Sequence, residues 1–283
     1  MIKNKLSLTH IGWDTQDHLK EFDHWNSMNN YEFMFKYGSF QEQKYLKERI
    51  FDFKNPSILD FGCATGTTNK YLRLLSKNIN YKYKGVDISK PSIEKAKTYY
   101  DKSEFELIEK NSDFLEKNKF DIVYSRDTVL HQTDPYKFLK SLLFATNKSL
   151  ILRLRTRDNG ETIFDVEKSC QLHYENYWMP YIILNFEELI NFLKDQKNVC
   201  NIRVNKSYMV LGGQNYRYLE KDLYYRKTGT AETALLIDLS NDSKNNKKNI
   251  KIETNIEGQI FIKSKRLKSA LLRASSLLTN KFN

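Results

Sequence analysis

Cysteine is scarce in this sequence of 283 residues, and the sequence contains no long apolar run. The three cysteines, Cys63, Cys170 and Cys200, lie far apart and are odd in number. They form neither a disulfide framework nor a paired-cysteine metal site, which points to a reducing, cytoplasmic setting. No run approaches the roughly 18 apolar residues of a membrane-spanning helix, and none follows the basic start, so we expect neither a transmembrane segment nor a secretory signal. No cluster of His, Asp and Glu has metal-ligand spacing, so we expect no metal.

Charge is the unusual feature of an otherwise ordinary composition, because 46 Lys and Arg against 35 Asp and Glu give +11. Residues 244–283 hold ten of the basic residues and only two acidic ones, a charge of +8. The remaining 243 residues carry 36 basic and 33 acidic groups, or +3. The excess therefore belongs to a tail, in which a basic amphipathic helix is predicted over 264–279. That helix could dock on the domain, on a partner or on an anionic membrane.

From residue 56 the sequence alternates between short β-rich runs and helical segments. Ser89 with Pro91, and Asp134 with Pro135, are typical of helix starts. Strands separated by helices imply right-handed crossovers, so the predicted fold is α/β: a Rossmann-like, doubly wound, mostly parallel sheet with helices on both faces. The predicted strands cover 57–61, 83–87, 105–108 (weakly), 120–125 and 149–154, and helices are predicted at 67–76, from 89 and from 134.

The rest of the chain divides into three predicted parts. The aromatic-rich residues 1–50 predict an N-terminal helical cap, and the main domain covers 51–239 with an aromatic-rich inserted loop at 158–185. Asn185 followed by Glu188 forms a capping box, which predicts a helix to about Lys194. A polar linker opens a C-terminal extension over 240–283. Further strands are predicted at 199–204, 233–239, 250–254 and 259–262.

Residues 58–66 read Ile-Leu-Asp-Phe-Gly-Cys-Ala-Thr-Gly, a strand that runs into a glycine-bearing turn before a helix. Such a turn lets a ligand approach the backbone closely. Asp87 ends the second strand, where a carboxylate can accept both hydroxyls of a ribose, and Asp113 follows the third, where an adenine amino group could reach it. Asp60 would repel a phosphate group but suits a cationic ligand such as an ammonium. The spacing also differs from the G-x-G-x-x-G of dinucleotide folds.

Residues 56–145 resemble the class I S-adenosylmethionine-dependent methyltransferases. The matching pieces are the turn at 60–66, Gly-Val-Asp at 85–87, Asn-Ser-Asp at 111–113, and 120–124 with Val-Leu-His at 129–131; Ala64 replaces the usual middle glycine. The resemblance implies S-adenosylmethionine as cofactor and S-adenosylhomocysteine as product. It assigns the methionine end to Asp60, Gly62 and Gly66, the ribose to Asp87, the adenine to Asp113 with Phe114, and a place near the sulfonium to Arg126. Cys63, Ala64 and Ile88 are further candidate cofactor-binding residues.

Two residues after the fourth strand are candidate catalytic groups. His131 lies where the substrate should enter, and its ordinary pKa near 6.5 suits a general base for a hydroxyl acceptor. The alternative is that His131 packs on or caps the following helix. Asp127 is a second candidate base, or else a structural hydrogen-bond acceptor.

Acceptor specificity in such folds lies in loops at the carboxyl ends of the strands. The three arginines at 153, 155 and 157 share one strand face, so Arg155 and Arg157 could bind a phosphate or carboxylate, or could simply be solvated. The aromatic stretch containing His173, Trp178 and Tyr181 could stack on a sugar ring, or could pack on the core as a lid.

Three functions compete at this stage. The leading hypothesis is methylation of an oxygen or nitrogen on a small or carbohydrate-like acceptor, with a faint resemblance to enzymes of bacterial surface-polysaccharide pathways. An RNA methyltransferase is the first alternative, but no base-flipping motif, catalytic cysteine motif or RNA-binding appendage supports a nucleic-acid partner. The second alternative is a non-catalytic cofactor-binding or scaffold protein.

Overall fold

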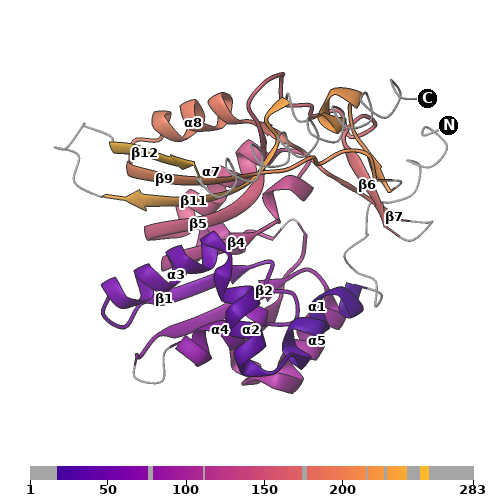
Figure 1. The fold of residues 1–283 in the computed structure, drawn as a ribbon. Helices are drawn as coiled ribbons and strands as arrows, with labels where there is room; N and C mark the ends of the chain where they lie inside the picture. Colours follow the sequence, from indigo (N-terminus) through magenta and orange to yellow (C-terminus); the bar gives the residue numbers. More distant parts are fainter. Residues whose placement is uncertain are drawn as a thin grey trace, which may run out of the picture.

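The computed structural model describes residues 18–75, 79–110, 112–173, 177–214, 216–225, 228–240 and 249–254. Within them, nine strands form the central sheet, in the order β12-β9-β11-β5-β4-β1-β2-β3 with β8 beside β5 (Figure 1). Neighbouring strands are parallel except β11, which is antiparallel to both β5 and β9. The bounds are β1 Ser57–Phe61, β2 Lys82–Asp87, β3 Phe105–Leu107, β4 Phe120–Arg126, β5 Thr146–Arg157, β8 Leu184–Asn185, β9 Val199–Tyr208, β11 Ala231–Leu239 and β12 Asn249–Thr254.

Helices cover both faces of this sheet, so the predicted α/β architecture is confirmed. One buried cluster joins the sheet to α2 (Asn30–Lys36), α3 (Gln41–Asp52), α4 (Thr67–Leu75) and α5 (Lys90–Tyr99). A second joins the other face to α6 (Phe114–Lys117), α7 (Pro135–Ala145) and α8 (Phe186–Asp195). Helix α1 (His18–Ser27) lies beside α4 and α5. The helices expected within 1–50 are therefore present from residue 18 and pack directly on the sheet.

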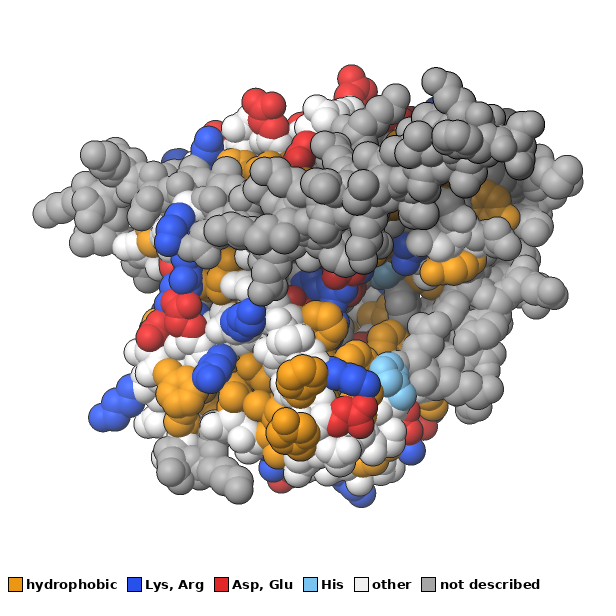
Figure 2. All heavy atoms as spheres, viewed as in Figure 1, with side chains coloured by type: hydrophobic (Ala, Val, Ile, Leu, Met, Phe, Trp, Pro, Cys, Tyr) orange, Lys and Arg blue, Asp and Glu red, His pale blue; other side chains and the backbone are white. Residues whose placement is uncertain are grey.

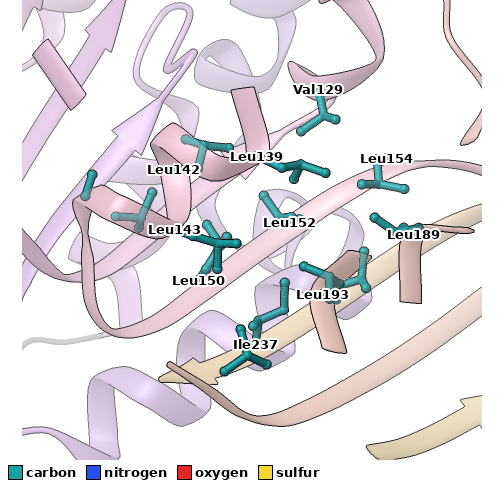
Figure 3. Close-up of a cluster of buried hydrophobic side chains, with 14 of the residues drawn as sticks. Val129, Leu139, Leu142, Leu143, Leu150, Leu152, Leu154, Leu189, Leu193 and Ile237 are labelled. Atoms are coloured by element: carbon teal, nitrogen blue, oxygen red, sulfur yellow. The ribbon is translucent and has the colours of Figure 1, made fainter. Parts of the chain in front are cut away.

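Strand β5 shows how the two clusters are separated. Leu150, Leu152 and Leu154 project into the cluster under α7 and α8 (Figure 3), whereas Ile151 belongs to the opposite cluster. Successive side chains of a strand point to opposite faces, which produces this division. Each of these leucines is at most 1% exposed, and burial of such a side chain contributes about 1.5–3 kcal/mol to folding. The same alternation directs Arg153 and Arg155 to the face of Ile151.

Helix starts follow the predicted caps. The side chain of Ser89 accepts from the Ser92 backbone N–H at 3.4 Å, and that of Asp134 accepts from the Lys137 N–H at 2.9 Å. At α8 the capping box is only half formed. Asn185 accepts from the Glu188 N–H at 2.9 Å, but Thr162 takes the reciprocal place: its hydroxyl accepts from the Asn185 N–H and donates to the Glu188 carboxylate.

The insert is not a loop throughout, which corrects the sequence-based expectation. It contains β6 (Cys170–His173) and β7 (Tyr177–Pro180), which form an antiparallel three-stranded sheet with β10 (Arg217–Tyr218). Figure 1 shows β6 and β7 to one side of the main sheet. These strands have two to four residues, too few for a period-2 pattern to stand out from the surrounding aromatics.

Four short 3-10 helices complete the described fold: η2 Tyr37–Ser39, η3 Lys102–Glu104, η4 Val129–His131 and η5 Lys221–Tyr224. None of the described helices has the length and hydrophobicity that crossing a membrane requires. Several predicted features fall outside the described residues: most of the linker after 240, the strand at 259–262 and the basic helix at 264–279.

Candidate active site

The turn between β1 and α4 forms the floor of the site. Gly62 and Gly66 each have a φ of +80°, and a Cβ atom at Gly62 would collide with the Thr128 side chain. Ala64 has a φ of +47°, a left-handed conformation that costs a non-glycine residue roughly 1–2 kcal/mol. The turn thus holds a strained shape, which its surroundings must stabilise.

Asp87 provides part of that stabilisation. One of its carboxylate oxygens accepts from the Ala64 N–H at 2.8 Å, and the other accepts from the Ser89 N–H at 2.8 Å. Each oxygen has a further lone pair that can accept from a ligand hydroxyl. Asp87 therefore shapes the turn and also suits the ribose role expected of it.

Asp60 is buried under the same turn, with an exposed fraction of 1%. Burial raises its pKa to about 7, although the Tyr83 hydroxyl donates to the carboxylate at 2.7 Å and so favours ionisation. A buried carboxyl group with few hydrogen bonds is costly unless a cation joins it. The residue is therefore suited to a cationic ligand group.

A cavity of about 1340 Å³ lies at the carboxyl ends of the parallel strands, between the turn and the three-stranded sheet. In Figure 2, basic and acidic side chains meet in a hollow above the N-terminal helices. The cavity brings together most of the residues expected from sequence: Asp60, Gly62, Cys63, Ala64, Asp87, Ile88, Arg126, Asp127, His131, Arg155 and Tyr181.

Five other candidates do not line this cavity. Gly66 acts through its backbone conformation alone. Asp113 and Phe114 border an adjacent pocket of about 360 Å³, which shares Ile108 and Ser112 with the main cavity, and Asp113 pairs with Lys117. The fourth is Arg157, which is ion-paired with Glu220 and Asp222, and the fifth is Trp178, which is buried in β7. The side chain of His173 lies outside the described residues.

A methyltransferase-domain family matches residues 52–222, which is more than half of the chain. The chain belongs to the class I S-adenosylmethionine-dependent methyltransferases. No curated protein matches the sequence.

Solved structures similar to the methyltransferase share little sequence with it. The plantazolicin methyltransferase BpumL in complex with S-adenosylhomocysteine is 18% identical, with 84% of this chain and 97% of that one covered and a TM-score of 0.49. The N-terminal domain of EvdMO1 with S-adenosylhomocysteine and D-fucose is 15% identical (71% and 84% covered, TM-score 0.47). Magnesium protoporphyrin IX methyltransferase from Synechocystis PCC 6803 with bound S-adenosylmethionine is 14% identical (78% and 94%, 0.44).

The residues around the turn fit the cofactor of this family. The buried Asp60 carboxyl group is an anionic partner for the amino acid ammonium, and Asp87 can accept from ribose hydroxyls. Ile88, Leu107 and Ile108 give the cavity an apolar wall beside Asp87, on which an adenine ring can pack.

His131 lies at the opposite side of the cavity in the methyltransferase. Its Nδ1 donates to the carbonyl oxygen of Pro180 at 2.8 Å, so in the neutral ring Nε2 carries the lone pair. Burial lowers the pKa of His131 to about 4, against the opposing effects of that hydrogen bond and of Asp127. The imidazole is therefore neutral at pH 7, but this pKa makes it a weaker base than an ordinary histidine.

Asp127 lies within a cluster of arginines. Its carboxylate contacts Arg155 at 2.7 Å and Arg153 at 3.6 Å. Burial would raise the pKa of Asp127, but Arg153, Arg155 and Arg126 together hold it well below its usual value. Such a weakly basic carboxylate favours the structural role over the catalytic one.

Two carboxylates that pair with arginines of the site without lining the cavity, and three residues that do line it, were not indicated by the sequence. Glu42, 2% exposed, pairs with Arg126 at 3.2 Å, and Glu232 pairs with both Arg153 and Arg155. Each carboxylate comes from an element distant in sequence, α3 or β11, so no local motif could indicate it. The three-stranded sheet adds further cavity residues: Gln171, Met179 and Arg217.

Proposed function

We propose that this methyltransferase acts on an oxygen or nitrogen of a small acceptor, of which a sugar is the leading candidate. The observation that supports this proposal is the walled cavity: its volume of about 1340 Å³ is of the order needed for one cofactor and one small ligand. Residues of the three-stranded sheet, Gln171, Met179 and Arg217, line one part of this cavity.

In this proposal the two sides of the cavity have different tasks. Asp60 binds the ammonium group, Asp87 the ribose and Ile88 the adenine, with Asp113 and Phe114 at the adenine edge. Bound S-adenosylmethionine supplies an electrophilic methyl group on its sulfonium. Tyr181 and Arg155 hold the acceptor in line with that group and exclude water, which lowers the barrier by fixing the reacting geometry.

His131 is the proposed general base. Its Nδ1–H is fixed by the Pro180 carbonyl, so Nε2 is the ring nitrogen that would accept the proton of an acceptor hydroxyl. The His131→Asn variant is expected to lower kcat by about 10²–10⁴-fold while S-adenosylhomocysteine affinity stays within twofold. Because the pKa of His131 is about 4, the wild-type rate should show no protonation step near pH 6.5.

The test is S-adenosylhomocysteine formation with a panel of sugars, sugar derivatives and bulk tRNA. The exposed His24 of α1 provides a matched control, since His24→Asn should leave the rate unchanged. A kcat loss under tenfold in His131→Asn would assign His131 to packing alone. Methylation of tRNA with no small acceptor turned over would favour the RNA alternative, and no turnover with any acceptor would favour the non-catalytic one.

A further inference from the structure

Arg217, at the start of β10, is a charged residue of the cavity that neither the family motif nor the proposed mechanism uses. Its guanidinium donates to the Gln171 side chain at 3.2 Å, to the Leu211 carbonyl at 3.2 Å and to the Gln214 side chain at 3.3 Å. It also lies 4.5 Å from the centre of the Tyr181 ring. No acidic side chain of the described residues forms an ion pair with it, so its charge is not neutralised within this part of the structure.

The charges of the neighbouring arginines are balanced by carboxylates, which distinguishes these arginines from Arg217. Three of them, Arg126, Arg153 and Arg155, contact three carboxylates, which belong to Glu42, Asp127 and Glu232. Addition of Arg217 leaves this wall of the cavity with one positive charge in excess. A half-buried cation beside buried groups is stabilised when an anion joins it.

Two donors beside Arg217 also lack partners. Arg155 is 8% exposed and lines the cavity, and its Nε–H makes no hydrogen bond within the described structure. The Tyr181 hydroxyl, on a side chain 3% exposed, likewise has no partner of acceptable geometry among described residues, although Arg155 lies close to it. Buried donors are rarely left unsatisfied in folded proteins, so this part of the wall is short of hydrogen-bond acceptors.

The cavity is also polarised from one side to the other. The cofactor side holds the carboxyl groups of Asp60 and Asp87, whereas the wall made by β5 and the three-stranded sheet presents Arg155 and Arg217. The cofactor carries two cationic groups, its sulfonium and its ammonium, against one carboxylate, so its net charge is positive and suits the acidic side. The basic wall is then left for the second ligand.

We propose that the methyl acceptor carries an anionic group, a carboxylate or a phosphate, that Arg217 and Arg155 bind with the Tyr181 hydroxyl. This inference rests on the proposed function and narrows its substrate class to acidic small molecules, such as a sugar acid or a sugar phosphate. Guanidinium groups bind both anions in a bidentate manner. With the anion fixed at this wall, His131 faces the remainder of the acceptor.

Binding of simple probes to the full-length protein saturated with S-adenosylhomocysteine tests this inference without turnover. Sodium glucuronate, glucose and inorganic phosphate are titrated by calorimetry at constant ionic strength. We expect glucuronate or phosphate to bind at least tenfold more tightly than glucose. Tighter glucuronate binding identifies a carboxylate site, and tighter phosphate binding identifies a phosphate site.

Variants then connect the binding to Arg217. Arg217→Gln should weaken anion binding by tenfold to a hundredfold, the usual loss for a charged hydrogen bond. Arg217→Lys keeps the positive charge but lacks the paired N–H donors of the planar guanidinium, so it should give an intermediate loss of anion affinity. Arg73→Gln, a matched change on α4 away from the cavity, should have no effect. Unchanged S-adenosylhomocysteine affinity verifies that each variant is folded.

Three results would overturn the inference: equal affinity for glucose and glucuronate, no saturable binding of either anion, or full anion affinity in Arg217→Gln. Each leaves the proposed function standing, because that is judged from S-adenosylhomocysteine formation with the whole panel of small acceptors, charged and uncharged. Conversely, methylation of tRNA with no small acceptor methylated would contradict the proposed function. The anion titrations would still report whether the cavity binds an anion through Arg217.

Discussion

Asp60 combines nearly complete burial with a pKa of about 7. This pKa lies above the unfolded value of about 3.9, so the folded state binds the Asp60 proton more tightly than the unfolded state does. The protonated form therefore stabilises the folded state at low pH, and this contribution is lost as pH rises through 7. A bound ammonium reverses the preference. We therefore expect Asp60, if it binds the cofactor ammonium as proposed, to couple cofactor binding to proton release at physiological pH.

The first prediction follows from that coupling. As pH increases toward 7, the affinity for S-adenosylhomocysteine should rise about tenfold per pH unit, and above pH 7 it should stay constant. Asp60→Asn should weaken binding and make it independent of pH between 5.5 and 8.5. Calorimetry in that range measures both effects, with the surface change Asp52→Asn as control. A flat profile in the wild-type protein would contradict the coupling.

Ala64 gives a second prediction at this scale, since it holds a left-handed conformation at a position where related turns carry glycine. Ala64→Gly should relieve about 1–2 kcal/mol of strain, partly offset by about 0.4–1 kcal/mol of unfolded-state entropy. We expect a net stabilisation of about 0.5–1 kcal/mol in thermal denaturation. The same substitution at Ala96, inside α5, should instead destabilise by about 1 kcal/mol or more. A lower melting temperature for Ala64→Gly would show that the turn is unstrained.

Among the elements, β5 contributes most to the fold. Leu152 is fully buried between the sheet and the α7 and α8 helices (Figure 3). Leu152→Ala should cost about 2–5 kcal/mol of unfolding free energy. Leu107→Ala, at the edge strand β3 where the side chain is 44% exposed, should cost less than about 1 kcal/mol. Urea denaturation of the two variants measures the difference, and similar losses would contradict the assigned packing.

The sequence predicted elements whose signal is local. The parallel strands, the caps at Ser89 and Asp134, and the turn at 60–66 each depend on residues a few positions apart, and the structure confirms them. The pairing of β10 with β6 joins Arg217 to Gln171 across 46 positions. No periodicity reports such a contact, so Arg217 and the three-stranded sheet could not be predicted. The partners of the β5 arginines were missed for the same reason.

For the whole molecule, the net charge has two sources in different parts of the sequence. Residues 244–283 carry +8 of the +11, whereas the cavity wall has a single excess cation. Only the second belongs to residues that we assign to the reaction. Affinity for polyanions and recognition of an acidic acceptor should therefore be separable.

Removal of residues 255–283 tests this separation. The deletion takes away six basic residues and Glu257, while β12 is retained. We expect weaker binding to tRNA with a smaller dependence on salt, and unchanged affinity for S-adenosylhomocysteine and for the anionic probe. Gel shifts across a salt series and calorimetry measure the two properties. Loss of anion-probe binding in the shortened chain would place the relevant cations in the tail.

The alternation along β5 has a consequence for redesign of the enzyme. One face of the strand carries the leucines that stabilise the core, and the other carries Arg153 and Arg155. The acceptor range can therefore be altered by a library at Arg155, Gln171, Tyr181 and Arg217 that leaves every core leucine in place. Variants with a neutral wall should gain uncharged acceptors at little cost in stability, provided that Asp127 is neutralised together with Arg155 and Arg217, so that Glu232 remains to pair with Arg153.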